Sequence, residues 1–108
     1  MSDVLVNLTL ELRRGALVLA VLSQLKDEQY GYALLQKLEK KKFIVEPGTL
    51  YPLLRRLEKQ GLLKSAWDTS KSRPRKFYIL SSEGLSIYHD LCLEWKGLVE
   101  GLSVLISD

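Results

Sequence analysis

Residues 49–63 read Thr-Leu-Tyr-Pro-Leu-Leu-Arg-Arg-Leu-Glu-Lys-Gln-Gly-Leu-Leu, and this stretch decides the fold of the 108-residue chain. Its leucines at positions 53, 54 and 57 fall within about 60° of Leu50 on a helical wheel that turns by about 100° per residue. The opposite side carries Arg55, Arg56 and Lys59, and Gly61 is typical of the residue that ends a helix. The stretch predicts a short helix with a leucine face and a cationic face.

The cationic face of this helix has two interpretations. Arginines and lysines on an exposed helix are most often an ordinary solvated surface. A short helix that is docked by leucines, and has no acid at the centre of its outer face, also suits the major groove of DNA. The choice between the two depends on the rest of the chain.

Charge is unevenly distributed along the sequence. The whole chain has a formal net charge of +3, but residues 30–80 hold 12 cations against 4 acids. The two ends together hold 4 cations and 9 acids. This asymmetry favours a polyanion as the partner of the middle region, with binding that weakens steeply as salt is added.

Composition excludes several classes of site. The single cysteine, Cys92, and the single histidine, His89, leave no cysteine-rich or histidine-cluster metal site and no intrachain disulfide. We find neither a catalytic triad nor a glycine-rich phosphate loop, and therefore expect no enzyme and no cofactor. Asp3 and Asn7 interrupt the N-terminal apolar run, and no apolar stretch approaches the ~20 residues that span a bilayer. We expect a single domain in the cytoplasm, away from membranes.

Hydrophobic periodicity predicts four helices and one β-hairpin. The helices are expected at about residues 5–24, 31–41, 47–60 and 82–106, with residues 27–29 as a polar turn and residues 43–45 as a short β-prone connection. Pro47 suits the first turn of the third helix, and Ser81 or Ser82 suits the N-cap of the fourth. Residues 62–67 and 76–80 read as two strands. The expected fold class is mainly α with a small β-hairpin (α+β).

This order of elements is that of a winged helix-turn-helix. The second and third helices form the helix-turn-helix pair, and the hairpin is the wing. The wing carries Lys71, Arg73, Arg75 and Lys76 with no acid among them, and Pro74 can stiffen its tip. These side chains are either ordinary solubilising loop residues or contacts to DNA phosphates, which position a protein on the duplex.

The fourth helix carries a long apolar seam. Residues of the seam recur at intervals of three and four, as in a coiled coil: Leu85, Tyr88, Cys92, Trp95, Val99, Leu102 and Ile106. A helix of ~26 residues is ~39 Å long, which exceeds what a small three-helix core covers. A second copy of the chain is the expected cover, and the alternative is a helix folded wholly onto its own domain.

We therefore predict a homodimer built from one compact unit per chain. Residues 1–80 form the winged helix-turn-helix DNA-binding region, residues 81–108 form the dimerisation helix, and residues 5–24 also contribute to the interface. A twofold dimer presents two recognition helices, which match palindromic half-sites about one DNA turn apart.

Three segments resemble the PadR family of bacterial transcriptional regulators. They are Tyr30-Gly31-Tyr32, the stretch from Gly48 to Glu58 with Gly61, and the wing exit from Arg75 to Gly84, and their mutual spacing agrees as well. The resemblance covers nearly the whole chain and is to the short members with one C-terminal helix. Family members commonly have Thr at the position of Ser81, and serine retains a capping oxygen.

The resemblance implies a dimeric winged-helix repressor of transcription that a small, often aromatic, effector releases from double-stranded DNA. The candidate DNA-binding residues, partly carried over by resemblance, are Thr49, Tyr51, Pro52, Arg55, Arg56 and Lys59 on the third helix and Lys71, Arg73, Arg75 and Lys76 on the wing. The alternative function is a winged-helix scaffold for protein interaction that binds no specific DNA sequence. The positive excess in residues 30–80 argues against that alternative.

Trp95 suggests where an effector would bind. The resemblance implies that an aromatic near this position lines a pocket between subunits for flat planar compounds. A large ring at a twofold seam is hard to pack against its own copy without leaving space. The candidate effector-binding residues are Leu8, Leu12, Tyr88, Cys92, Trp95 and Val99. The alternative is that Trp95 is simply core, and Cys92 is interpreted as a small buried hydrophobe rather than a thiol switch.

Overall fold

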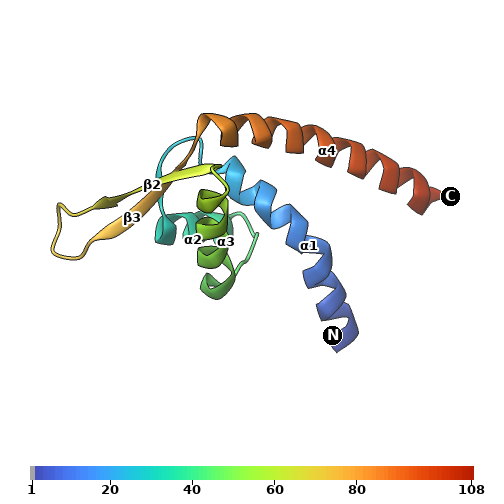
Figure 1. The fold of residues 1–108 in the computed structure, drawn as a ribbon. Coiled ribbons are helices and arrows are strands. Elements are labelled where there is room, and N and C mark those ends of the chain that lie inside the picture. Colours follow the sequence, from blue (N-terminus) through green and yellow to red (C-terminus); the bar gives the residue numbers. More distant parts are fainter. Residues whose placement is uncertain (1) are drawn as a thin grey trace.

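The computed structural model describes residues 2–108, so residue 1 of the predicted DNA-binding region lies outside it. The elements are α1 (Asp3–Ser23), β1 (Gln29–Tyr30), α2 (Gly31–Lys40), α3 (Pro47–Lys59), β2 (Leu63–Asp68), β3 (Arg75–Leu80) and α4 (Ser82–Ser107). The hairpin of β2 and β3 projects from one side of the helical unit, and α4 runs away from it on the other (Figure 1). The predicted α+β fold class is confirmed.

The core lies where the C-terminal half of α1 meets α2 and α3. Val21 and Leu22 of α1 and Leu34 of α2 are completely buried there. The predicted leucine face of α3 is confirmed, because all four of its leucines are at most 8% exposed. Burying one such side chain stabilises the fold by about 1.5–3 kcal/mol. Hydrophobic burial thus fixes which side of α3 remains outside.

The end of α3 sets the direction of the wing. Gly61 has a φ of +83°, the left-handed conformation that glycine adopts without steric cost. The Leu62 N–H donates to the Leu57 carbonyl at 3.0 Å, and the Gly61 N–H donates to the Glu58 carbonyl at 2.9 Å. This pair of bonds is a Schellman motif, which satisfies the last carbonyls of the helix and turns the chain into β2.

The sheet has three antiparallel strands in the order β1-β3-β2. The predicted hairpin is confirmed. The polar turn expected at residues 27–29 is wrong at its last residue, because Gln29 belongs to β1 and pairs with Tyr78 of β3. A strand of two residues is too short for alternation to reveal it. The β-prone residues 43–45 form no strand; Phe43 and Val45 pack partly on the core, and Ile44 is 68% exposed.

The junction of α3, the wing and α4 is held by Ser81. Its hydroxyl caps α4 by accepting from the Gly84 N–H at 2.9 Å and donates to the Gly61 carbonyl at 2.7 Å. A Cβ atom on Gly84 would lie 2.0 Å from the Leu62 carbonyl oxygen, so only glycine permits α4 to begin this close to the chain entering β2.

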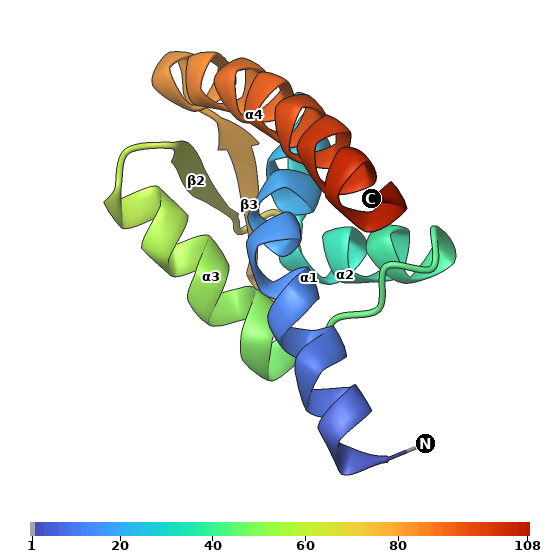
Figure 2. The ribbon, with the colours of Figure 1, turned by 90° about the vertical axis from the view of Figure 1, so that its right-hand side faces the viewer.

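The distal halves of α1 and α4 leave the core and diverge from each other (Figures 1 and 2). The molecule is accordingly elongated, with extents of 57 × 34 × 23 Å. Apolar side chains on both helices remain in solvent, including Leu8 and Leu12 of α1 and Trp95, Val99 and Leu102 of α4. Within α4 only Gly84 is fully buried. The protomer therefore covers the start of the seam in part, near Tyr88 and Cys92, and leaves its C-terminal part from Trp95 onward exposed.

Candidate nucleic-acid interface

The outer face of α3 is cationic and unpaired. The exposed residues of this face are Thr49, Pro52, Arg55, Arg56 and Lys59. Among the described residues the one salt bridge joins Glu58 to Lys76, so Arg55, Arg56 and Lys59 have no acidic partner within 4 Å. Three uncompensated cations on the exposed side of a well-anchored helix can approach a polyanion without first breaking an ion pair.

Tyr51 lies at the flank of this face rather than at its centre. It is half-buried, and a Cβ atom on Gly31 would lie 2.8 Å from the Tyr51 Cε1 atom. The glycine at the start of α2 therefore gives the Tyr51 ring a place against the other helix of the pair. Of the predicted α3 contacts, Tyr51 is the one whose ring also has a structural role inside the protomer.

The loop end of the wing strands is tied to Tyr30, just before α2, by Asp68. The Tyr30 hydroxyl donates to Asp68 Oδ2 at 2.5 Å, and the Ser70 backbone N–H and hydroxyl donate to Asp68 Oδ1 at 3.0 and 2.6 Å. The hydrogen bonds from Ser70 and then from Tyr30 hold the pKa of the Asp68 carboxyl well below its usual range. The same bond to Asp68 raises the pKa of Tyr30.

The four wing cations differ in their exposure and in whether they contact other side chains of the protomer. Lys71 and Arg73 are exposed at the tip. The Arg75 guanidinium carbon lies 4.3 Å from the centroid of the Tyr30 ring, and Arg75 is paired in register with Asp68. The sequence showed no acid in the run from Lys71 to Lys76. The fold brings two acids from outside that run, Asp68 opposite Arg75 and Glu58 against Lys76. Lys71 and Arg73 are therefore the freest of the predicted wing contacts.

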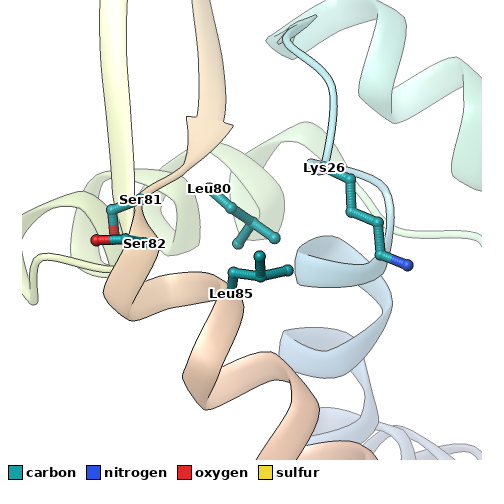
Figure 3. Close-up of a pocket in the computed structure, with 5 residues that line it drawn as sticks. All are labelled: Lys26, Leu80, Ser81, Ser82 and Leu85. Atoms are coloured by element: carbon teal, nitrogen blue, oxygen red, sulfur yellow. The ribbon is translucent and has the colours of Figure 1, made fainter.

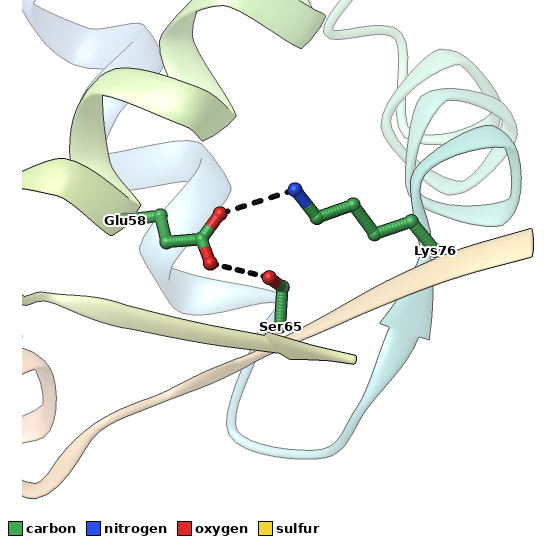
Figure 4. A network of polar contacts seen from close by, with 3 residues as sticks. All are labelled: Glu58, Ser65 and Lys76. Atoms are coloured by element: carbon green, nitrogen blue, oxygen red, sulfur yellow. Dashed lines mark hydrogen bonds and ion pairs between the residues drawn. The ribbon is translucent and has the colours of Figure 1, made fainter. Parts of the chain in front are cut away.

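Lys76 reaches across to α3 instead of outward (Figure 4). Its Nζ atom lies 3.3 Å from Glu58 Oε1, and the Ser65 hydroxyl of β2 donates a short hydrogen bond to Glu58 Oε2. The bond from Ser65, followed by that from Lys76, lowers the pKa of Glu58. Glu58 thus links α3 to both wing strands and fixes the angle between the two candidate DNA-contacting elements. Sequence reasoning assigned no role to Glu58 or Ser65.

A cleft of about 420 Å³ lies between α2, α3 and the wing, and we call it the reading-face cleft. Its lining residues are Tyr30, Gly31, Tyr32, Tyr51, Arg55, Trp67, Arg75, Lys76 and Tyr78. Four of the five tyrosines of the chain, all except Tyr88, and one of its two tryptophans thus meet at one place. Sequence reasoning did not find this cleft, because its walls come from four separate segments of the chain that only the fold brings together.

The candidate effector residues are not gathered into a cavity within one protomer. Leu8 and Leu12 lie on the half of α1 that diverges from α4 and are 57% and 76% exposed; Trp95 and Val99 are 47% and 43% exposed. Tyr88 and Cys92 are half-buried, and a hydrogen bond between them raises the pKa of Tyr88. A second cavity, of about 260 Å³, lies at the start of α4 and is lined by Lys26, Leu80, Ser81, Ser82 and Leu85 (Figure 3). It contains none of the candidate effector residues.

Residues 2–108 offer neither a membrane-spanning helix nor a metal-binding cluster. No helix in residues 2–108 is long and apolar enough to cross a membrane. The same residues contain no group of three His, Cys, Asp or Glu side chains that could hold a metal ion.

Comparison with known proteins places the chain in a family. Residues 18–90 match the model of the PadR-like family of transcriptional regulators. A transcriptional regulator of Mycobacterium tuberculosis is 40% identical over 75 residues, which is 68% of this chain and 70% of that protein.

Solved structures agree with this match. A PadR family transcriptional regulator from Eggerthella lenta superposes with a TM-score of 0.91 at 47% identity, covering 96% of this chain and 93% of that one. A PadR-like transcription factor from Bacteroides fragilis superposes with a TM-score of 0.78 at 37% identity, covering 92% and 98% of the two chains. From its sequence and from its fold, the chain belongs to the PadR-like family of transcriptional regulators.

Proposed function

We propose that this regulator is a sequence-specific DNA-binding repressor, not an enzyme, that acts as a homodimer in the cytoplasm. The observation that carries the proposal is the division of α3 into a buried leucine face and a face of unpaired cations. A helix anchored in this way can enter the major groove without losing contact with the core.

The wing extends the same surface. With α3 in the major groove, the exposed tip cations Lys71 and Arg73 would lie along phosphates of the adjacent backbone and set the position of the protein on the duplex. Arg55 and Arg56 would then read base edges or contact the flanking backbone. Arginine is suited to reading because its two donors match the O6 and N7 acceptors of guanine.

Arg55→Ala tests this assignment. A preferred duplex is first selected from random sequences with the purified protein, and its affinity is then measured by fluorescence anisotropy. We expect Arg55→Ala to lose about 1–3 kcal/mol of specific binding and to relax the preference at one base pair. Arg14→Ala, on the exposed side of α1, removes the same charge outside this surface and should bind nearly as wild type. An unchanged base preference in Arg55→Ala would remove the reading role.

A salt series separates DNA recognition from a scaffold that binds proteins. If six or more phosphates are neutralised, affinity should fall roughly a thousandfold or more between about 50 and 200 mM salt. Lys71→Ala and Arg73→Ala should each lower the slope of log affinity against log salt by about one and leave the preferred sequence unchanged. Absence of any duplex binding at low salt would favour the scaffold function.

The second copy of the chain is proposed to cover the exposed seam. Leu8, Leu12, Trp95, Val99 and Leu102 are each more than 40% exposed on the two diverging helices. Apolar surface of this extent on α1 and α4 favours association, and a twofold arrangement places two α3 helices on one side for a palindromic operator.

The dimer seam is also the proposed effector site. Leu8, Leu12, Tyr88, Cys92, Trp95 and Val99 lie on the two helices that we expect to meet across the axis, and a planar aromatic compound could lie between them. In a Trp67→Phe protein, Trp95 becomes the only tryptophan reporter. Saturable quenching of Trp95 by a planar aromatic, with loss of DNA affinity, would support the site, and unchanged fluorescence across a series of such compounds would count against it.

A further inference from the structure

Glu58 is the single acid in α3, and its position in that helix is unfavourable. It lies in the last turn of Pro47–Lys59, where the helix dipole favours cations and disfavours acids. Carboxylic acids in proteins usually titrate near pH 4, so Glu58 is charged at neutral pH. A contact outside the helix therefore explains this acid better than the stability of α3 does.

Arg55 is the nearest cation of α3 that Glu58 could bind. Residues three positions apart lie on the same side of a helix, with Cβ atoms about 5–6 Å from each other, and opposite charges at this spacing attract. The other helix neighbours of Arg55, three or four positions away, are Tyr51, Pro52 and Lys59. Within α3, Glu58 is thus the one acid that could take the Arg55 guanidinium away from a duplex.

The fold prevents this pair from forming. The Glu58 carboxylate faces the wing, where Oε1 lies 3.3 Å from the Lys76 Nζ atom and Oε2 accepts from the Ser65 hydroxyl (Figure 4). Arg55 has no acidic partner within 4 Å among the described residues. Both oxygens of Glu58 are therefore occupied by the wing strands, and the Arg55 guanidinium is left free.

Lys76 is held in place from its other side as well. Its Nζ atom lies 5.9 Å from the centroid of the Trp67 ring and 5.3 Å from that of the Tyr78 ring. Its side chain is 28% exposed, whereas Lys71 and Arg73 extend from the tip of the wing into solvent. An ammonium that already has a carboxylate and two rings as partners gains less from a phosphate than these tip cations do.

We propose that Lys76 is a positioning residue for DNA recognition, which holds the Glu58 carboxylate against the wing and thereby keeps the Arg55 guanidinium available to DNA. Lys76 acts through Glu58 on Arg55 and is not itself a phosphate contact. Without Lys76, Glu58 turns towards Arg55 and draws it away from the duplex. The inference rests on the proposed function, in which Arg55 contacts base edges.

Base discrimination is the property that separates this role from a phosphate contact. It is measured as the ratio of affinities for the preferred duplex and for a duplex changed at the base pair that Arg55→Ala relaxes. A phosphate contact carries no sequence information, so its loss weakens both duplexes equally and cancels in the ratio. We expect Lys76→Met to lower the ratio about two- to sixfold, the effect of one exposed ion pair that competes for Arg55. Lys64→Met removes the same charge from the opposite face of the wing sheet and should leave the ratio unchanged.

A double-mutant cycle tests whether Lys76 acts through Glu58. Glu58→Gln alone should retain the wild-type ratio, because a neutral amide does not attract Arg55. Lys76→Met should then have no further effect on the ratio in the Glu58→Gln protein, and Lys76→Arg should behave as wild type. If Lys76→Met does not fold by circular dichroism, Lys76→Gln replaces it. An unchanged ratio in Lys76→Met, or a loss that persists with Glu58→Gln, would overturn the proposal.

Nuclear magnetic resonance of the free protein decides the same point without DNA. The Arg55 Nε–Hε signal is identified by its absence from the spectrum of Arg55→Ala. We expect Lys76→Met to shift this signal, Lys64→Met to leave it in place, and Glu58→Gln to abolish the shift. No shift with Lys76→Met, or one that remains with Glu58→Gln, would refute the proposed link. A protein that ignores every duplex would refute the proposed function, while these spectra still show whether Lys76 keeps Glu58 from Arg55.

Discussion

At the scale of single residues, Asp68 connects the wing to the rest of the molecule. Its two carboxylate oxygens accept from Tyr30, at the start of α2, and from Ser70, in the wing loop. The bond from Tyr30, 38 positions away, forms only in the folded chain, and all three bonds favour the ionised carboxylate. Asp68 therefore helps to orient the wing and the paired Arg75, together with the Glu58 contacts to Ser65 and Lys76.

The pH dependence of stability should reveal this group. The folded-state pKa of Asp68 is lowered, so its contribution to stability is fully present above the unfolded value of about 3.9 and is lost as pH falls through the folded pKa. In urea unfolding, the difference between wild type and Asp68→Asn should be constant near pH 6 and shrink as pH falls below about 4. A difference that does not change with pH would show that the charge of Asp68 contributes nothing.

Lys42 is the one described non-glycine residue with a left-handed backbone, at a φ of +63°. It follows α2, where the Phe43 N–H donates to the Leu38 carbonyl at 2.9 Å, so it occupies the helix-ending position that glycine usually fills. Lys42→Gly should raise the free energy of unfolding by about 1 kcal/mol. Lys41→Gly removes the same charge at a φ of −90° and should destabilise by about 0.5–1 kcal/mol. Equal effects of the two changes in urea unfolding would contradict the assignment.

At the scale of elements, the contact of α4 with the α3–β2 turn determines where the last helix points. Ser81 caps α4 and binds Gly61, and Gly84 lets the first turn of α4 touch the Leu62 carbonyl. Glycine is a poor helix former, so its use at this buried position reflects the space available rather than helix propensity.

Replacing Gly84 and Gly97 of α4 separates the effect of limited space from the effect of helix propensity. Gly84→Ala would place Cβ 2.0 Å from the Leu62 carbonyl oxygen, and the required backbone shift should cost about 1–3 kcal/mol or more. Gly97→Ala meets no atom within 4 Å in the protomer and should stabilise the helix by about 0.5–1 kcal/mol. Thermal unfolding of both variants checks the opposite signs, and a neutral Gly84→Ala would contradict the close approach.

At the scale of the whole molecule, α1 and α4 extend beyond the core and end in solvent with apolar side chains. The winged helix-turn-helix unit has its own buried core, so the distal halves of these helices contribute little to folding of one chain. Their composition is better explained by contact with another copy. Oligomeric state is therefore the property on which the proposed half-site geometry depends.

Leu12→Asp tests this state, because Leu12 is 76% exposed and its replacement should not disturb the core. We expect wild type to be a dimer at micromolar concentration in sedimentation equilibrium and Leu12→Asp to shift towards the monomer with its circular dichroism unchanged. Ile44→Asp changes a residue that is 68% exposed in the connection before α3, and should remain dimeric. A monomeric wild type would refute the proposed dimer.

The local pattern of the sequence determined the four helices, the hairpin and the two faces of α3. Leucines at helical spacing identify the buried side of α3, because burial of apolar area is the largest favourable term and acts on near neighbours along the helix. Gly61 was likewise recognisable from sequence, and Ser81 was one of the two cap candidates, since caps depend on residues within one turn.

Only the tertiary structure decided which cations remain free and where a ligand could bind. Tyr30 and Asp68 are 38 positions apart, and the Glu58 to Lys76 ion pair and the reading-face cleft join segments that no local period relates. Strand β1 was missed for the same reason, because two residues become a strand only when β3 lies beside them. Periodicity reports which face of an element is buried, whereas a contact between distant side chains exists only after those faces have packed.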